Sequence, residues 1–383
     1  MHRFKTVSDI RIEPGGTSRL DAHVRDLPRN KRIAIVTDKG VRALGLMDAG
    51  IAALQDSGYD VMIFDEVVAD PPEDVVIAGA KAVKRFDAGM VIGFGGGSPM
   101  DTAKLIAFLA DNDVTLSEIY GVDVAQGSRL PLLLMPTTSG TGSEVTNVAI
   151  ITAGPDSHNK GSKNAVVSDP LYADRVLLDA NLTLGLPAHI TAATGIDAMV
   201  HAIEAYTSVH RKNPISDAIG LSALRKLSRA IGRAVNVPDD VEARNDMLIG
   251  AMLAGQAFSN APVGAIHGLA YPLGGFFHVP HGLSNSLVMV EVMKFNAQED
   301  RAKQWYGEIA SDLCVGTSAS ALIDEILRLQ DETRVQRRLR DVDIAADAIP
   351  MMADDAILKD RVLRNNPRAM TRDDIVRIYE TIA

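Results

Sequence analysis

The sequence has 383 residues, of which 46% are hydrophobic and 23% charged, and its 39 basic and 49 acidic side chains give a formal net charge of −10. This balance is typical of a globular chain that buries a sizeable core, with enough length for two or three domains, and it excludes a disordered chain. An acidic surface repels phosphate backbones, so we expect no nucleic-acid partner.

Location is indicated by what the sequence lacks. The single cysteine, Cys314, cannot form an internal disulfide. No run approaches the roughly 18 uninterrupted apolar residues of a membrane span, and residues 1–6 lack the apolar core of a signal peptide. We therefore expect a cytoplasmic protein that does not act at a membrane.

The first half of the chain alternates apolar runs with helical patterns. Strands are predicted at residues 32–36, 61–64, 88–94 and 130–135, and the clearest helix at residues 73–86. Apolar strands that alternate with helices pair in parallel and are covered on both faces. This half therefore predicts an α/β domain of the nucleotide-binding type with a parallel sheet.

The second half has a different texture. Beyond about residue 179, apolar residues recur every three or four positions, as in Leu221, Leu224, Leu227 and Ile231, and strand-like runs almost vanish. This spacing predicts an all-α domain. We place the boundary before Leu186-Pro187, which gives an α/β domain at residues 1–185 and a helical domain at residues 186–383.

A glycine-rich turn follows the third predicted strand. Residues 93–101 read Gly-Phe-Gly-Gly-Gly-Ser-Pro-Met-Asp and precede a helical pattern. Glycines let a backbone approach a pyrophosphate, whose charge then meets the free N–H groups of the next helix. Ser98, Pro99 and Asp101 also form a capping-box pattern with proline at the first helical position, so a well-capped turn without a ligand explains the segment about equally well.

Two more segments could contact a dinucleotide. Residues 136–144 follow a buried strand and carry five hydroxyls and two glycines. They offer donors to phosphate or ribose oxygens, or they form a polar turn that bonds its own backbone. Asp38 ends the first strand, where a carboxylate can accept bonds from ribose hydroxyls and would repel a 2′-phosphate, or where it can cap a helix.

The second half contains a pattern of metal-ligand residues. Asp197 and His201 stand at i and i+4 of a helical segment, so they share one face. His267 and His281 lie in an apolar, glycine-rich segment further on, with His278 as an alternative to His281. Each histidine alone is explained as well by packing, but one carboxylate with several imidazoles suits iron or zinc.

These segments together resemble the iron-containing alcohol dehydrogenase family, in order and over nearly the whole chain. The matching positions are Gly95-Gly96-Gly97-Ser98 with Asp101 and Lys104, Pro136-Thr137-Thr138 with Gly140-Thr141-Gly142-Ser143-Glu144, Asp169-Pro170, Asp179, Ala193-Thr194-Gly195 with Asp197 and His201, His267 through His281-Gly282 with Asn285, Phe295-Asn296 and Asn366-Pro367-Arg368.

The resemblance implies a set of site residues. It implies an N-terminal dinucleotide domain, an all-helical C-terminal domain, a metal in a cleft between them, NAD as cofactor, and a dimer or larger homo-oligomer. The implied metal ligands are Asp197, His201, His267 and His281, and the implied pyrophosphate contacts are Gly96, Gly97 and Ser98. The further candidate cofactor contacts are Asp38, Asp101, Thr137, Thr138, Thr141, Ser143, Lys163 and, on the adenine side, Leu182.

Tyr271 departs from the family pattern. Many relatives have a second histidine four residues after the third ligand, and here that position is Tyr271. We expect Tyr271 and His267 to share one helix face as candidate catalytic residues, with Pro272 ending or kinking the helix just beyond. A packed tyrosine with a bonded hydroxyl is the alternative.

The sequence thus predicts an oxidoreductase that transfers a hydride between a small alcohol and NAD with a divalent metal, Fe²⁺ or alternatively Zn²⁺. An activity similar to that of hydroxyacid-oxoacid transhydrogenases or 4-hydroxybutyrate dehydrogenases is the alternative. A lyase resembling dehydroquinate synthase would need clustered lysines and arginines, which residues 267–281 do not offer. An idle nucleotide-binding protein would not need all four ligands.

Overall fold

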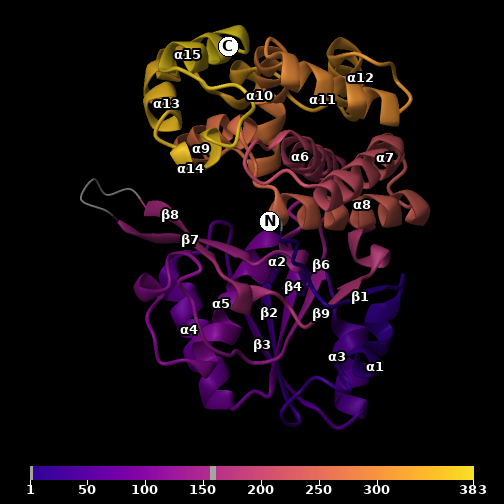
Figure 1. Cartoon of the computed structure of the whole chain (residues 1–383). Coiled ribbons are helices and arrows are strands. Elements are labelled where there is room, and N and C mark those ends of the chain that lie inside the picture. The colour runs from indigo at the N-terminus through magenta and orange to yellow at the C-terminus, as the bar shows by residue number, and fades with distance from the viewer. Residues whose placement is uncertain (1–2, 156–160) are drawn as a thin grey trace. The chain divides into compact units, whose positions relative to one another are not determined.

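The computed structural model describes residues 3–155 and 161–383. The chain divides into two compact units (Figure 1). The sheet unit comprises Thr6–Thr138 and Ser143–Thr183. The helical unit comprises Leu184–Ala383, Ser139–Gly142 and the N-terminal residues up to Lys5. Whether residues 1–185 and 186–383 form independent domains stays a prediction.

A six-stranded parallel sheet forms the centre of the sheet unit. Its strands lie in the order β1 (Asp9–Ile12), β9 (Arg175–Leu178), β6 (Leu132–Pro136), β4 (Met90–Gly95), β2 (Arg32–Asp38) and β3 (Asp60–Val67). This sheet confirms the predicted α/β fold. The strands β1 and β9 were not predicted, because each has only four residues and neither forms a long apolar run.

Helices cover both faces of this sheet. They are α1 (Leu20–Val24), α2 (Lys39–Ala43), α3 (Asp48–Asp56), α4 (Glu73–Phe86) and α5 (Gly97–Asp111). Side chains alternate along a strand, so Ile92 of β4 packs with α1 and α3 in one apolar cluster while Gly93 faces the other way. A Cβ at Gly93 would lie 2.7 Å from the Cβ of Ala103, so this glycine lets α5 approach the sheet closely.

A smaller sheet was not predicted. It contains β5 (Gly121–Val122), β8 (Gly161–Val167) and β7 (Val148–Pro155), with β7 and β8 antiparallel. Strand β8 begins with polar residues and β5 has only two residues, whereas β7 begins with an apolar run at residues 148–151 that was not predicted as a strand.

The helical unit confirms the predicted all-α second half. Its helices are α6 (Ala188–Thr207), α7 (Pro214–Asn236), α8 (Val241–Asn260), α9 (Ala265–Phe277), α10 (His281–Asn296), α11 (Asp300–Asp312), α12 (Ala319–Thr333), α13 (Ile349–Ala356), α14 (Asp360–Leu363) and α15 (Arg372–Thr381). One apolar cluster runs through most of them, which holds α6, α9 and α10 in fixed relation.

The predicted capping box at the glycine-rich turn is wrong. Helix α5 begins at Gly97 with Gly96 as its N-cap, and no side chain caps it. The carboxylate of Asp101 is engaged outside the helix instead, where it accepts hydrogen bonds from the Ser143 hydroxyl at 2.5 Å and the Ile150 N–H at 3.0 Å. The first N–H groups of α5 are therefore left without a side-chain partner.

Lys104 ties α5 to the segment that follows β6. Its side chain is fully buried, and its ammonium donates to the Val148 carbonyl at 2.7 Å and the Ser143 hydroxyl at 2.8 Å. It also pairs with Asp101 at 3.3 Å. Burial lowers the pKa of Lys104, and the Asp101 carboxylate opposes that shift.

We predict that Lys104→Met destabilises the protein by about 3 kcal/mol, because the buried oxygens around Lys104 would lose their donor. Thermal unfolding measures the change as a lowered Tm. Lys81→Met, on the exposed side of α4, is the matched control and should change stability by less than about 0.5 kcal/mol. Equal melting of both variants would contradict the account of Lys104.

Candidate active site

Helix α6 carries three polar side chains on one buried face. Asp197, His201 and Glu204 stand at i, i+4 and i+7, and 5% or less of each residue is exposed. Charged and polar groups are rarely buried together without mutual bonds or a ligand. The rest of this helix is mainly apolar and packs in the core of the helical unit.

Helices α9 and α10 bring two histidines to that face. His267 lies in the first turn of α9, and His281 is the first residue of α10. A Cβ at Gly282 would lie 2.4 Å from the Ala193 carbonyl oxygen of α6. The glycine therefore lets the start of α10 contact α6, which places His281 beside Asp197.

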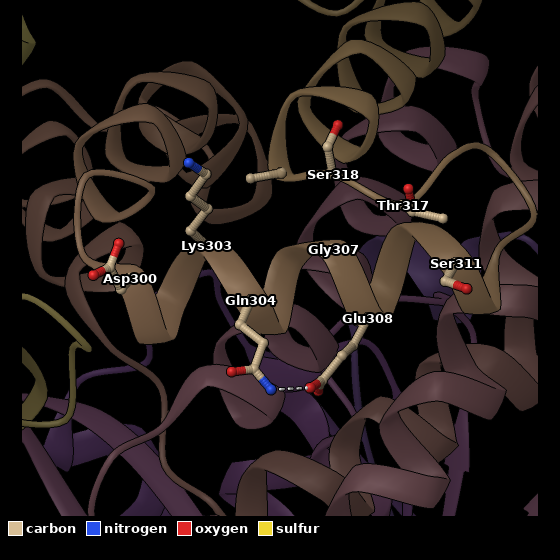
Figure 2. A pocket seen from close by; sticks show the side chains of 9 residues that line it. Asp300, Lys303, Gln304, Gly307, Glu308, Ser311, Thr317 and Ser318 are labelled. Atoms are coloured by element: carbon tan, nitrogen blue, oxygen red, sulfur yellow. Dashed lines mark hydrogen bonds between the residues drawn. The ribbon is translucent and has the colours of Figure 1, made fainter.

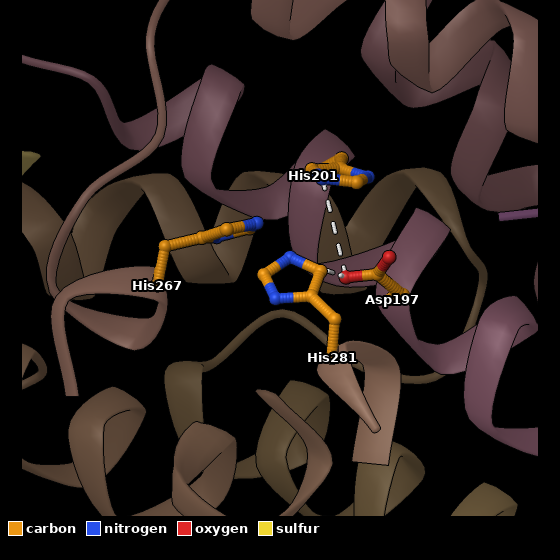
Figure 3. Close-up of side chains that lie close together, drawn as sticks. All are labelled: Asp197, His201, His267 and His281. Atoms are coloured by element: carbon orange, nitrogen blue, oxygen red, sulfur yellow. Dashed lines mark ion pairs between the residues drawn. The ribbon is translucent and has the colours of Figure 1, made fainter. Parts of the chain in front are cut away.

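The four side chains converge on one point (Figure 3). One ligand atom from each of Asp197, His201, His267 and His281 lies within 4.8 Å of the others. The Asp197 Oδ1 atom is 3.9 Å from the Nε2 atom of His201 and 3.8 Å from that of His281. The imidazoles and the carboxylate are turned toward one another, as in a ligand set before it closes on a cation.

Glu204 determines which nitrogen of His267 faces this point. The His267 Nδ1 atom lies 2.6 Å from the Glu204 carboxylate, which also accepts the Ile266 N–H at 2.7 Å. A carboxylate only accepts, so Nδ1 carries the proton and donates it. The Nε2 lone pair of His267 is thereby left to face the other ligand atoms.

Burial shifts the pKa of one imidazole of this group, that of His201, and neighbouring groups shift the pKa of Asp197. Burial lowers the pKa of His201 to about 3, although Asp197 opposes the shift. Burial alone would raise the pKa of Asp197, but the imidazoles and the Asn285 amide outweigh it and lower that pKa. One carboxylate oxygen with several imidazole nitrogens is a donor set that fits a divalent first-row metal.

Asn285 lies among the ligand atoms. Its amide donates to Asp197 Oδ1 at 2.7 Å, and its Nδ2 atom lies 3.3 Å from the Nε2 atoms of His267 and His281. Among the described residues, its buried Oδ1 atom has no hydrogen-bond partner. Neither Asn285 nor Glu204 was among the predicted site residues, although Glu204 lies seven residues after Asp197 on the same helix face.

Tyr271 lies beside the cluster, one turn after His267. Its ring centroid is 6.5 Å from that of His267 and 6.3 Å from that of His281. Burial raises the pKa of Tyr271, and the positive charge of Arg361 opposes the shift. Helix α9 continues through Pro272 to Phe277, so this proline does not end the helix, and a kink at Pro272 stays a prediction. Proline has no N–H, so the bond to the Gly268 carbonyl is lost.

The predicted dinucleotide segments gather at one edge of the parallel sheet. Strands β2, β4 and β6 are neighbours, so their carboxyl ends lie together. The Thr137 N–H donates to the Gly95 carbonyl at 2.9 Å, and a Cβ at Gly96 would lie 3.6 Å from the Thr138 hydroxyl oxygen. That hydroxyl is buried and has no partner among the described residues.

The other candidates for cofactor contacts have structural partners. Asp38 is the N-cap of α2 and accepts the Val41 N–H at 2.8 Å. Helix capping is the alternative to a ribose contact that the sequence also allows for Asp38. Lys163 pairs with Asp70 at 2.6 Å, and Leu182 is buried in the apolar cluster of the sheet unit. Thr141 belongs to the helical unit, as part of Ser139–Gly142.

Comparison with known proteins decides the family. The model of the iron-containing alcohol dehydrogenase family matches residues 8–180, and the model of its C-terminal domain matches residues 191–383. The chain belongs to the iron-containing alcohol dehydrogenase family. It is therefore an oxidoreductase that acts on CH–OH groups, as the sequence predicts.

Individual relatives agree with this assignment. A long-chain-alcohol dehydrogenase of Geobacillus thermodenitrificans is 37% identical over 95% of this chain and 93% of its own. The crystal structure of a 1,3-propanediol oxidoreductase matches with a TM-score of 0.93 and 31% identity over 100% of both chains. A sulfoacetaldehyde reductase of Bifidobacterium kashiwanohense, solved with NAD⁺, matches with a TM-score of 0.88 and 26% identity over 100% of this chain and 99% of that one.

The family also confirms the expected cofactors of this dehydrogenase, NAD and a divalent metal, with iron as the metal of the family description. Among the described residues, no helix combines the length and apolar character needed to cross a membrane. A small-molecule alcohol as substrate is consistent with the relatives, which are named as alcohol dehydrogenases.

A separate surface hollow of about 600 Å³ lies beside α11 and the start of α12 (Figure 2). Lys303, Gln304, Glu308 and Ser318 are among its lining residues, and Gln304 donates to Glu308 at 2.8 Å. None of the four converging side chains, Asp197, His201, His267 and His281, lines this hollow.

Proposed function

We propose that Asp197, His201, His267 and His281 hold one divalent ion, and that this dehydrogenase exchanges a hydride between NAD(H) and a small alcohol or aldehyde at that ion. The observation that supports the proposal is the convergence of these four ligand atoms within 4.8 Å. When bound, the ion supplies Lewis acidity to the oxygen of the substrate.

The chain's own residues prepare the site for this chemistry. Glu204 holds the proton of His267 on Nδ1, so that Nε2 is always available as a ligand. The His281 side chain is 43% exposed, whereas those of Asp197 and His267 are each 3% exposed. His281 therefore marks the side from which a substrate reaches the cluster.

Tyr271 is proposed as a hydrogen-bond donor to the substrate. Its phenol hydroxyl is a hydrogen-bond donor, and its ring lies 6.5 Å from that of His267 and 6.3 Å from that of His281. With its pKa raised above an ordinary value of about 10, the phenol stays neutral near pH 7. It can orient a substrate but is a poor proton shuttle.

For NAD, we propose that the pyrophosphate binds at Gly96, Gly97 and Ser98, where α5 begins without a side-chain cap. The buried, unpartnered hydroxyl of Thr138 supports a polar ligand at this edge of the sheet. Further proposed cofactor contacts are Asp38, Asp101, Thr137, Thr141, Ser143, Lys163 and Leu182. Asp101 and Ser143 both accept hydrogen bonds from Lys104, so we propose that they hold the glycine-rich turn at residues 93–101 in position.

The substrate, the oligomeric state and the cellular location of this dehydrogenase are proposals as well. Relatives are named for a neutral substrate, 1,3-propanediol, and for a charged one, sulfoacetaldehyde. We propose a cytoplasmic homodimer or larger homo-oligomer acting on a short-chain alcohol or aldehyde. Tyr271 in place of the family's second histidine keeps a hydroxy-acid substrate as the alternative.

We predict that His267→Ala lowers metal content and turnover together, by about 100-fold or more for turnover, because one of four ligands is lost. Metal analysis and NADH absorbance measure the two. His210→Ala, at an exposed histidine outside the cluster, is the control and should change neither. Full metal content and turnover in His267→Ala would refute the assignment.

We predict a preference for NAD over NADP, because Asp38 would face the 2′-phosphate. Two like charges in contact cost a few kcal/mol even at an effective dielectric of ~20. Asp38→Gly should narrow the preference in kcat/KM by about tenfold or more. Asp38→Asn keeps the cap on Val41 and removes only the charge, so it should narrow the preference as well.

Two outcomes would contradict the role of Asp38. Comparable kcat/KM for both cofactors in the unmodified enzyme would leave Asp38 as a helix cap alone. A narrowed preference in Asp38→Gly but not in Asp38→Asn would assign the effect to the helix end and not to the charge.

We predict that Tyr271→Phe keeps the metal and lowers kcat/KM by about 2- to 10-fold, which is the loss of one hydrogen bond. Steady-state kinetics on several alcohols, with metal analysis as the control, measure this. Unchanged kinetics on all of them would show that Tyr271 is only a packing residue.

A further inference from the structure

Helix α9, which carries the third proposed ligand in its first turn, begins at a residue that cannot cap it. Its N-cap is Gly264, and a glycine has no side chain to bond the free N–H groups of the first turn. Side chains from two distant parts of the chain take these N–H groups instead. The Asn366 Oδ1 atom accepts the Ala265 N–H at 3.4 Å. The Glu204 carboxylate accepts the Ile266 N–H at 2.7 Å.

The bare backbone at Gly264 gives both side chains their place. A Cβ there would lie 3.3 Å from the Glu204 Oε1 atom and 3.4 Å from the Asn366 Oδ1 atom, so a side chain would press on both oxygens. The other oxygen of Glu204 lies 2.6 Å from the Nδ1 atom of His267. The start of α9 and the ring of its ligand are therefore held from the same point.

Asn366 is itself held by Asn296, the last residue of α10. The Asn366 Nδ2 atom donates to Asn296 Oδ1 at 2.7 Å, and the Asn296 Nδ2 atom donates to Asn366 Oδ1 at 3.0 Å. Asn296 also donates to the Tyr306 hydroxyl at 3.3 Å, and Asn366 to the Arg368 carbonyl at 2.6 Å. Each asparagine is 7% exposed or less, so little water competes for these bonds.

Arg368 fixes the segment that carries Asn366 to the same end of α10. Its guanidinium lies 3.9 Å from the centroid of the Phe295 ring, a cation–π contact, and donates to the Phe295 carbonyl at 3.0 Å. The sequence motifs at residues 295–296 and 366–368 thus contact each other, although they are 70 residues apart. The proposed active site has so far assigned no role to either motif.

These contacts join the two helices that bring histidines to α6. His281 is the first residue of α10 and Asn296 is its last, so Asn366 links the far end of α10 to the start of α9. Metal–ligand distances tolerate deviations of only about 0.2 Å. A small shift at the start of α9 would therefore weaken the hold of His267 on a metal.

We propose that Asn366, paired with Asn296, is a positioning residue for His267, because it fixes the first turn of α9 where the imidazole meets the other three proposed ligands. This inference rests on the proposed function, since it concerns the metal assigned to that cluster. Asn366 acts through the backbone of α9. A role in packing alone would lower stability without changing metal affinity, so these two measurements separate the roles.

The first test measures the binding of Co²⁺ alone, by titration against a chelator. In Asn366→Ala, the Kd should rise by about tenfold, the lower end of the effect of changing residues behind metal ligands. Asn213→Ala is the matched control, because Asn213 is also buried and caps α7, which carries none of the four proposed ligands. Both variants should lower the Tm, but only Asn366→Ala should weaken Co²⁺ binding.

Asn296→Ala tests the same pair without removing a bond to α9. It should raise the Kd for Co²⁺ in the same direction and by less, since Asn366 loses its support but keeps its oxygen. Because Asn296 acts through Asn366, adding Asn296→Ala to Asn366→Ala should raise the Kd no further. Additive effects of the two changes would contradict the pair as the positioning device.

A second test needs no metal. NMR of the protein with isotope-labelled histidine should show a protected signal from the Nδ1–H of His267, which Glu204 accepts, and His267→Ala assigns it by its loss. Asn366→Ala should shift or broaden this signal, and Asn213→Ala should not. If the unmodified protein binds no Co²⁺ but the signal responds in this way, the positioning role stands and the proposed function fails.

The opposite result overturns the inference alone. If the unmodified protein binds Co²⁺ at the cluster, and Asn366→Ala changes neither the Kd nor the His267 signal, then Asn366 does not position this ligand. The proposed function would stand without it.

Discussion

The hydrogen bond between Glu204 and His267 is the interaction on which the proposed active site depends. It joins α6 to α9 at 2.6 Å in the interior of the helical unit, and it fixes the proton of His267 on Nδ1. A buried carboxylate is costly unless it is fully bonded, and Glu204 achieves this with the His267 ring and the Ile266 N–H. The same helix supplies Asp197 and His201, so one rigid element sets the positions of two ligands and orients a third.

Glycines set the spacing of the elements around that bond. Gly282 lets α10 contact α6 at the first residue after His281, and Gly268 lets α14 lie against α9. In the sheet unit, Gly93 does the same for α5, whose uncapped start is the proposed pyrophosphate site. At Gly282 the atom met is a backbone oxygen at 2.4 Å, so a side chain there would move the start of α10, and His281 with it, away from α6.

The sequence predicted those features that depend on local patterns. The helix at residues 73–86 was found with its observed ends, and Asp197 and His201 share a face because four residues make about one helical turn. At the glycine-rich turn, the sequence allowed both a side-chain helix cap and an uncapped phosphate site, and local patterns could not distinguish them. Ser98 and Asp101 had a capping pattern, but Asp101 is bonded by Ser143 and Ile150, which lie more than 40 residues away.

Long-range partners explain what the sequence could not show. Glu204 and His267 are 63 residues apart, and Asn285 and Asp197, which also share a hydrogen bond, are 88 residues apart. Only the packing of α6, α9 and α10 in one apolar cluster brings these side chains together.

Anomalous diffraction from crystals of the iron-loaded protein, measured at the iron absorption edge, tests the central claim most directly. The account predicts one peak per chain, within about 2.3 Å of an Asp197 oxygen and of the Nε2 atoms of His201, His267 and His281. A protein that binds one iron per chain but places the peak away from these four side chains would contradict it.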